Sequence, residues 1–132
     1  LNKMGRYYSG DIEGKFWFAV QSSDDADFFG VTGQSAYINY YFDEDNLPDI
    51  EEGIARCEDA LGKDKAILDE FFKEHDAYNN EMIVQYYKDK HNETITDKDV
   101  KPKLQWYARL GLGNQIWECV KENGQCSFEA EL

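Results

Sequence analysis

The densest group of chemically active side chains is a run of carboxylates in residues 43–52. This run, Asp-Glu-Asp-Asn-Leu-Pro-Asp-Ile-Glu-Glu, holds six acids in ten residues. Carboxylate oxygens bind hard cations and basic side chains. An EF-hand calcium loop starting at Asp43 would need an oxygen ligand and then glycine where Leu47 and Pro48 stand, so that site is excluded. We expect the run to bind a basic protein partner, through Asp43, Glu44, Asp45, Asp49, Glu51, Glu52 and the neighbouring Tyr40 and Tyr41.

A second group of carboxylates comprises Asp24, Asp25 and Asp27, which follow an apolar segment. Loops carry function more often than the elements they connect, and three neighbouring carboxylates suit a cation or a guanidinium group. We therefore treat these three residues as candidate metal ligands. Solvated loop acids without a ligand are the alternative.

The familiar catalytic motifs are absent from the sequence. There is no G-x-S-x-G, H-E-x-x-H or G-x-x-x-x-G-K-[ST], and residues 111–114 lack the third glycine of a dinucleotide loop. Cys57 falls on an apolar helix stripe, and His75 and His91 fall near expected helix ends, where a cationic ring suits the negative terminus. We predict no catalytic residue and no cofactor, and favour a non-enzymatic role. An enzyme that depends on carboxylates or a divalent cation is the alternative.

Charge is the strongest compositional signal. The 132-residue chain has a net charge of −13, and residues 1–78 hold 18 acids and 7 bases, whereas residues 79–132 hold 9 acids and 7 bases. Because phosphate binding draws on clustered Lys and Arg, this composition argues against direct binding of nucleic acid. A basic protein is the expected partner, and a nucleic-acid mimic or inhibitor would be a special form of such a module. Acidity that serves solubility alone is the competing interpretation.

The three cysteines, Cys57, Cys119 and Cys126, are an odd and widely spaced set without a C-x-x-C pair. Such usage is typical of a reducing compartment, so we expect a soluble, cytoplasmic protein. No apolar run approaches the roughly 20 residues of a membrane span, and no membrane partner is predicted. The sequence leaves the oligomeric state open, and a structural subunit of an oligomer is a third functional hypothesis.

The elements that would position these groups begin with strands. Residues 15–21 place apolar side chains on both faces, which predicts a central strand. Residues 28–31 and 36–42 flank a turn and predict a hairpin, and Arg6-Tyr7-Tyr8 predicts an edge strand. A strand through the Tyr40-Tyr41 pair would send one ring to each face.

Helices are predicted next. Apolar residues recur at helical spacing over residues 50–72, which predicts one long helix or two joined at Gly62. Asp49 and Glu52 have the spacing of a capping box at its start.

Two further helices should follow. Asn79 or Asn80 can cap the first of them, which should stop near residue 91. Asp99 is the preferred cap of the second, because it keeps Pro102 in the first turn. The glycines in residues 111–113 are expected to end this helix.

The sharpest local pattern lies at the C-terminus. Residues 116–122 and 125–131 flank Asn123-Gly124, a pair typical of a type I′ turn, and together they predict a β-hairpin. In that register Glu118 would face Glu129, where two carboxylates can share a proton.

Strands, then helices, then a closing hairpin predict a single α+β domain over residues 1–132. We expect an antiparallel sheet, built from the N-terminal strands and the C-terminal hairpin, with three or four helices packed on one face. A winged-helix-like unit in residues 79–132 is the alternative, which the net negative charge disfavours.

Overall fold

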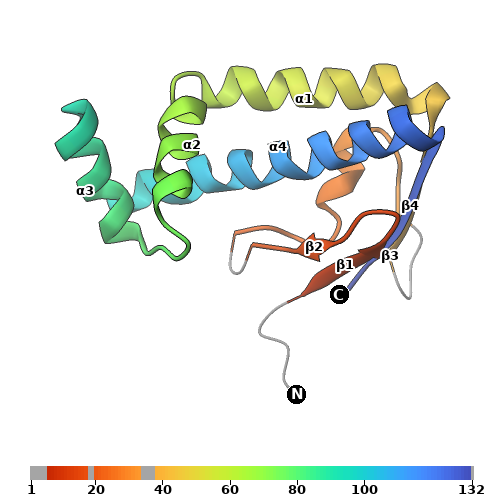
Figure 1. The fold of residues 1–132 in the computed structure, drawn as a ribbon, viewed down its shortest axis with the longest axis horizontal. Helices are drawn as coiled ribbons and strands as arrows, with labels where there is room; N and C mark the ends of the chain where they lie inside the picture. The colour runs from red at the N-terminus through yellow and green to blue at the C-terminus, as the bar shows by residue number, and fades with distance from the viewer. Residues whose placement is uncertain (1–5, 18–19, 34–37, 132) are drawn as a thin grey trace.

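The computed structural model describes residues 6–17, 20–33 and 38–131, and it contains a four-stranded antiparallel sheet beside four α-helices (Figure 1). The predicted α+β fold is confirmed. The strands, in the sheet order β2-β1-β4-β3, are β1 (Tyr7–Gly10), β2 (Gly14–Lys15), β3 (Ile38–Asp43) and β4 (Gln125–Ala130). The last strand of the chain thus pairs with two strands from its first third.

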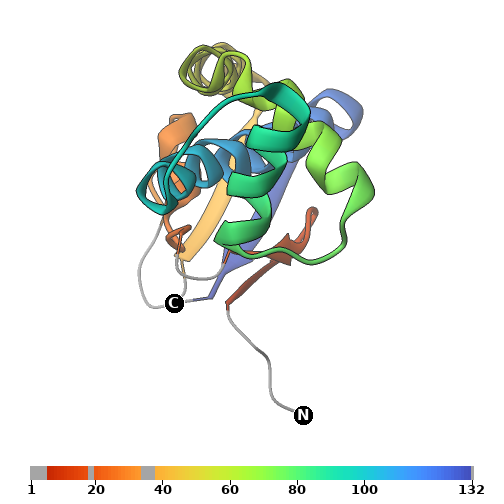
Figure 2. The same ribbon diagram turned by 90° about the vertical axis from the view of Figure 1, so that its left-hand side faces the viewer.

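The helices form the second part of the fold. They are α1 (Leu47–Leu61), α2 (Asp64–Glu74), α3 (Asn80–His91) and α4 (Asp97–Asn123), with two short 3-10 helices, η1 (Asp25–Phe29) and η2 (Glu44–Asn46). α4 lies between α1 and the strands and contacts both, whereas α2 and α3 pack near its N-terminal end (Figures 1 and 2).

The face of the sheet that meets α4 is aromatic. Strand alternation turns Tyr40, Phe42 and Phe128 inward, and the Tyr40 and Phe42 rings stack on Phe128 with centroids 5.2 and 6.2 Å away. Tyr41 and Glu129 point to the opposite face and are exposed. The sheet therefore has one buried face and one wet face, as the period of two requires.

Two glycines let α1 and α4 approach closely. A Cβ added at Gly53 would lie 2.6 Å from the Phe29 ring, and one added at Gly113 would lie 2.5 Å from the same ring. Phe29 is fully buried at the end of η1. The two helices and η1 are therefore locked together around one aromatic side chain.

Several predicted helix boundaries are confirmed. The long amphipathic segment is two helices, which separate at Gly62, whose φ is +53°. The Asn79 side chain accepts a hydrogen bond from the Met82 N–H at 2.9 Å and caps α3. α3 ends at His91, and Asn92 adopts the left-handed conformation that closes it.

The predicted start and end of the fourth helix are wrong. Thr96 is the N-cap, and it forms a reciprocal capping box with Asp99 that places Pro102 inside the helix. The capping box favours this start and offsets part of the cost of an interior proline. α4 also runs on through Gly111 and Gly113, because these residues face open space and the Phe29 ring, where no larger side chain is needed.

The predicted C-terminal hairpin is also wrong, and the winged-helix alternative fails with it because residues 116–122 are helical. Ile116, Cys119 and Val120 are all buried, which fits helical spacing. Gly124, at φ +80°, ends α4 by donating its N–H to the Val120 carbonyl, and the chain then enters β4. Asn-Gly here is a helix stop and not a hairpin turn.

The N-terminal strands differ from the prediction as well. The expected central strand over residues 15–21 contains only Lys15 of β2 among its described positions, and residues 18–19 lie outside the described chain. Residues 28–29 belong to a 3-10 helix and do not pair with β3, which pairs with β4 instead. The expected edge strand, β1, lies between β2 and β4.

We predict opposite effects for two alanine substitutions in α4. Gly113→Ala should lower the free energy of unfolding by about 1–3 kcal/mol, because its methyl group would overlap the buried Phe29 ring. Gly111→Ala, which meets nothing within 4 Å, should raise it by about 0.4–1 kcal/mol. Urea denaturation of the two variants measures both changes, and equal effects would contradict the packing described.

Candidate functional site

The acidic residues predicted to bind a partner surround the start of α1. The Asp43 side chain accepts a hydrogen bond from the Asp45 N–H at 3.0 Å, while the Asn46 side chain accepts one from the Asp43 N–H at 2.9 Å. This reciprocal arrangement caps η2 and replaces the predicted Asp49/Glu52 capping box, since α1 begins without a side-chain cap. The carboxylates left exposed are those of Glu44, Asp45, Asp49, Glu51 and Glu52.

The end of α4 adds two acids, Glu118 and Glu122, that are distant from this run in the sequence. α1 and α4 run antiparallel, so the start of one lies beside the end of the other (Figure 1). The Trp117 indole N–H donates to Glu51 Oε2 at 2.9 Å and joins the two helices there. Glu118 and Glu122 are exposed on the same turns of α4.

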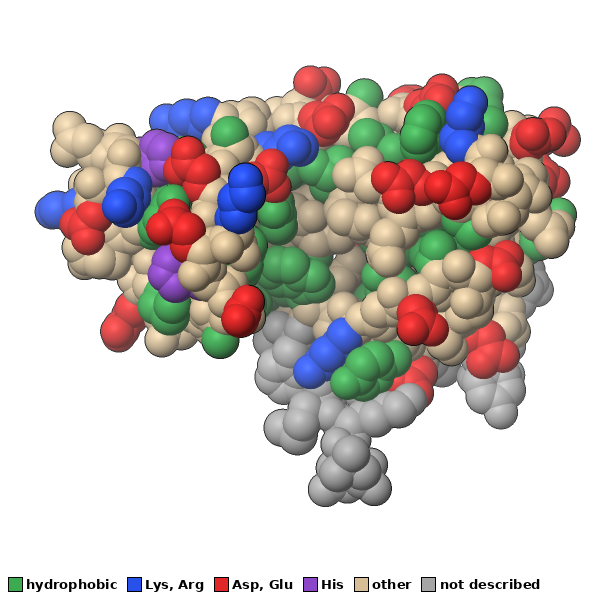
Figure 3. Space-filling model, viewed as in Figure 1, with side chains coloured by type: hydrophobic (Ala, Val, Ile, Leu, Met, Phe, Trp, Pro, Cys, Tyr) green, Lys and Arg blue, Asp and Glu red, His purple; other side chains and the backbone are tan. Residues whose placement is uncertain are grey.

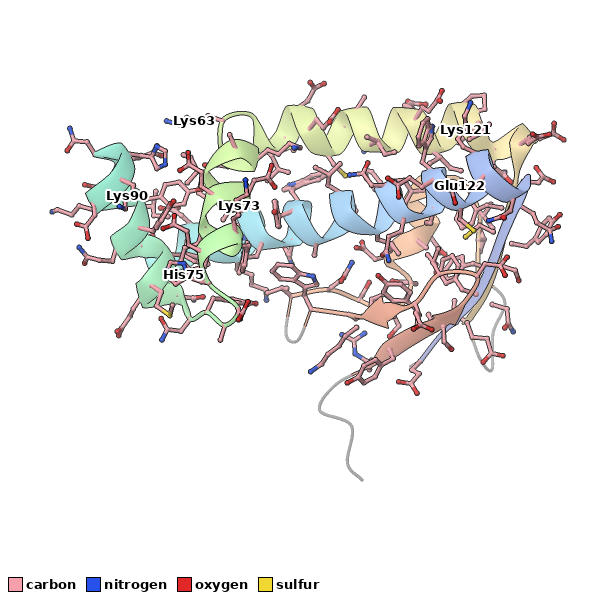
Figure 4. All side chains as sticks on the ribbon, viewed as in Figure 1. Lys63, Lys73, His75, Lys90, Lys121 and Glu122 are labelled. Carbon is pink, nitrogen blue, oxygen red and sulfur yellow. The ribbon has the colours of Figure 1, made fainter. Side chains whose placement is uncertain are left out.

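We call the combined surface the acidic face. Figure 3 shows carboxylates at the end of the molecule where α1 begins and α4 ends, and Figure 4 labels Glu122 and Lys121 there. Its members are Asp43, Glu44, Asp45, Asp49, Glu51, Glu52, Glu118 and Glu122. The four-residue spacing of Glu118 and Glu122 would have placed them on one helix face. The prediction of a strand over residues 116–122 prevented that assignment.

The negative charge of the acidic face is not neutralised by ion pairs among the described residues. Lys121 lies beside the face, but its ammonium group stands 5.6 Å from the centre of the Trp117 ring. The ion pairs between described side chains are Lys63–Glu93, Lys65–Asp69, His91–Glu70, Lys103–Asp64 and Arg109–Asp25. The ion pairs between described residues therefore lie around α2, α3 and the core, and none of them includes a residue of the acidic face.

Only one of the two candidate tyrosines is available to a partner. Tyr41 is 51% exposed, whereas Tyr40 is 1% exposed and donates its hydroxyl to Asp27 at 2.7 Å. Alternation along β3 sends the two rings to opposite faces, as expected, and the inner ring belongs to the core. The prediction that Tyr40 binds a partner is therefore wrong, because its side chain is buried.

The second acidic group does not converge on one point. Asp24 accepts from the Ser22 hydroxyl, Asp27 accepts from Tyr40 and the Gly33 N–H, and Asp25 turns into the core. Within residues 6–17, 20–33 and 38–131, no three side chains of His, Cys, Asp or Glu lie close enough together to hold a metal ion. Local hydrogen bonding accounts for these carboxylates.

Asp25 takes part in a buried polar network that sequence reasoning missed. Its two oxygens accept from Arg109 Nε at 2.7 Å and from Gln21 Nε2 at 2.8 Å. The Arg109 guanidinium lies 4.9 Å from the Phe28 ring centre and 4.8 Å from that of Trp106. Because the partners are 84 positions apart in the chain, no local pattern could have paired them.

Tyrosine hydroxyls hold several other carboxylates. Tyr87 donates to Asp64 at 2.8 Å, and Tyr86 donates to Glu74 at 2.8 Å. Burial, followed by these hydrogen bonds to a negative group, raises the pKa of both phenols above the ordinary value of 10.0. Such tyrosines act as neutral donors and not as bases.

The remaining candidate groups are structural. The predicted Glu118–Glu129 pair is absent, because Glu118 lies on α4 and Glu129 faces Ser9 and Asn39 across the sheet. His91 bonds to Glu70 at 2.9 Å, and the His75 ring stacks on Phe71 at 4.4 Å.

The three cysteines are free and buried. Burial raises the pKa of the Cys57 thiol to about 12, so Cys57 is protonated and unreactive at neutral pH.

Comparisons of the chain with known protein families, curated proteins and solved structures find no match. Among the described helices, none combines the length and the apolar character needed to cross a membrane. The assignment of a function therefore depends on the geometry of the site.

We predict that the buried ion pair contributes far more stability than an exposed one. Arg109→Met should lower the free energy of unfolding by about 3–5 kcal/mol, because it leaves the Asp25 carboxylate buried without its cation. Lys65→Met is the matched control, and it removes an exposed pair to Asp69 that contributes about 0.3–0.5 kcal/mol. Urea denaturation distinguishes the two, and similar losses would contradict the role given to Arg109.

The tyrosines provide a prediction for alkaline pH. Tyr40, Tyr86, Tyr87 and Tyr107 have a raised pKa when folded, so the folded protein holds these protons above pH 10 and the unfolded chain does not. Their contribution to stability is complete below about pH 10 and falls as the pH rises further. In an alkaline titration, tyrosinate absorbance should therefore appear at a higher pH in the native protein than in the urea-unfolded chain, where it should appear near pH 10. Coincident titrations would contradict the hydrogen bonds described.

Proposed function

We propose that this chain is a binding module whose acidic face engages a basic protein partner, without catalysis of its own. The observation that carries the proposal is the separation of charge: ion pairs stand at α2, α3 and the core, and the acidic face has none among the described residues. An uncompensated field of one sign attracts an oppositely charged partner and speeds association.

The position of two acids supports a binding role over simple solubility. Glu122 stands in the last turn of α4, where the negative helix end favours cations, and Glu118 lies one turn earlier, at the repulsive spacing of four residues. Folding alone would favour basic residues there. A basic partner that neutralises these two carboxylates would explain why acids stand at positions that helix stability disfavours.

Tyr41 extends the candidate surface onto the open face of the sheet. It is exposed and lies in β3, the strand that ends at Asp43 and leads into η2. Tyrosine contributes a large contact area at low entropic cost and is enriched at protein interfaces. A partner that covers the acidic face and the end of β3 would therefore meet both charge and an aromatic anchor.

The test compares two variants of equal charge. The face variant combines Glu52→Gln, Glu118→Gln and Glu122→Gln, and the control combines Asp76→Asn, Glu81→Gln and Asp89→Asn, which are exposed elsewhere. Immobilised wild-type protein should capture a basic protein from lysate at about 50 mM NaCl and release it at about 300 mM. Quantitative mass spectrometry should show at least a tenfold loss for the face variant and retention by the control.

The control variant makes the outcome decisive. Equal losses in both variants would mean that net charge alone governs capture, and the proposal would be rejected. Capture that does not change with salt or with either variant would reject it as well.

A further inference from the structure

A groove opens beside Trp17, along the middle of α4. Its walls come from α2, from the middle of α4 and from the segment that follows β2, and its volume is about 310 Å³. Cavities of this size accommodate small molecules. Figure 3 shows hydrophobic surface gathered between α2 and the strands, over this region.

The groove has aromatic walls and an open floor. The rings of Trp17 and Tyr107 meet edge to face, with centroids 6.0 Å apart and planes at 75°. Between Ala108 and Asn114, the floor includes Gly111, where an added Cβ would find no atom within 4 Å. A flat ring can therefore lie on the backbone of α4 against an aromatic wall.

The charge of the groove is opposite to that of the molecule. Lys15 and Lys65 line it against a single carboxylate, Asp69. The oxygens of Asp69 already accept from the Tyr107 hydroxyl at 2.6 Å and from Lys65 at 3.0 Å. Burial alone would raise the pKa of Asp69, but these two hydrogen bonds outweigh it and lower the pKa. The carboxylate is therefore charged, and its oxygens already accept hydrogen bonds from Tyr107 and Lys65.

Other cavities between described residues differ in this respect. The largest of those compared, about 560 Å³, has three carboxylates and one lysine, from Glu74, Glu81, Asp89 and Lys90. A neighbouring cavity on the other side of Trp17 has one lysine and one carboxylate, Lys15 and Asp76. Two more have one lysine against two acids each. Among these five cavities, only the groove beside Trp17 has more lysines than carboxylates among its lining residues.

We propose that this groove binds a small ligand that joins a planar aromatic ring to an anionic group, either phosphate or carboxylate. The ring stacks against Trp17 and Tyr107 above Gly111, and the anion meets the ammonium group of Lys15 and shares that of Lys65 with Asp69. Stacking tolerates many rings, whereas Lys15 favours a ring that carries an anionic group, because an uncharged ring supplies no counter-charge. The site is independent of the acidic face.

The experiment titrates the full chain with four probes and follows the amide of Gly111 and the indole N–H of Trp17 by NMR. Adenosine monophosphate joins a ring to a phosphate, and indole-3-acetate joins a ring to a carboxylate. Adenosine has the ring without the anion, and inorganic phosphate has the anion without the ring. Either or both of the complete probes should shift both signals, at least tenfold more tightly than adenosine or phosphate alone. Which probe binds identifies the anion.

Three variants test the geometry. Gly111→Leu fills the floor at an exposed helix position and should abolish binding, and Lys65→Gln should weaken it about tenfold. Lys121→Gln, on the far end of α4, is the matched control and should leave affinity unchanged. Circular dichroism and melting confirm that each variant is folded.

The proposal is overturned if neither complete probe shifts the two signals at about 5 mM, or if adenosine binds as well as its phosphate. It is also overturned if folded Gly111→Leu and Lys65→Gln bind like the wild type.

Discussion

The close approach of α1 to α4 determines where the two candidate surfaces lie. Gly53 and Gly113 make room for the Phe29 ring, and the antiparallel helices then bring the start of α1 beside the end of α4. The acidic face is a consequence of that packing. Gly111 is two residues from Gly113, about 200° around the helix, so the opposite side of α4 is left for the groove beside Trp17.

Neutral donors compensate for the shortage of cations. With 27 acids and 14 Lys and Arg, nearly half of the carboxylates cannot have a basic partner of their own. Tyrosine and tryptophan donors hold several of them, as Tyr87 holds Asp64 and Trp117 holds Glu51. The few cations can then serve special positions, such as Arg109 in the core. The high tyrosine content is thus tied to the acidity of the chain.

Local signals predicted the fold class and several boundaries, and they failed where one signal has two meanings. Gly62 and Asn79 were among the boundary positions that the sequence indicated, because a glycine with positive φ and a side-chain cap act within one helical turn. Asn123-Gly124 suits both a type I′ turn and a helix end. The helix end is adopted because buried residues of the 116–120 segment pack against α1 and the sheet. These contacts are long-range and cannot be read from the local sequence.

The sequence by itself determined the acid-rich composition, the α+β class and the run of carboxylates in residues 43–52, since these depend on neighbouring residues. Only the tertiary structure added Glu118 and Glu122 to that run, buried Asp25 against Arg109, and brought Lys15 and Lys65 to the lining of one groove. These residues are far apart in the chain, and only the packing of α4 against its neighbours brings them together.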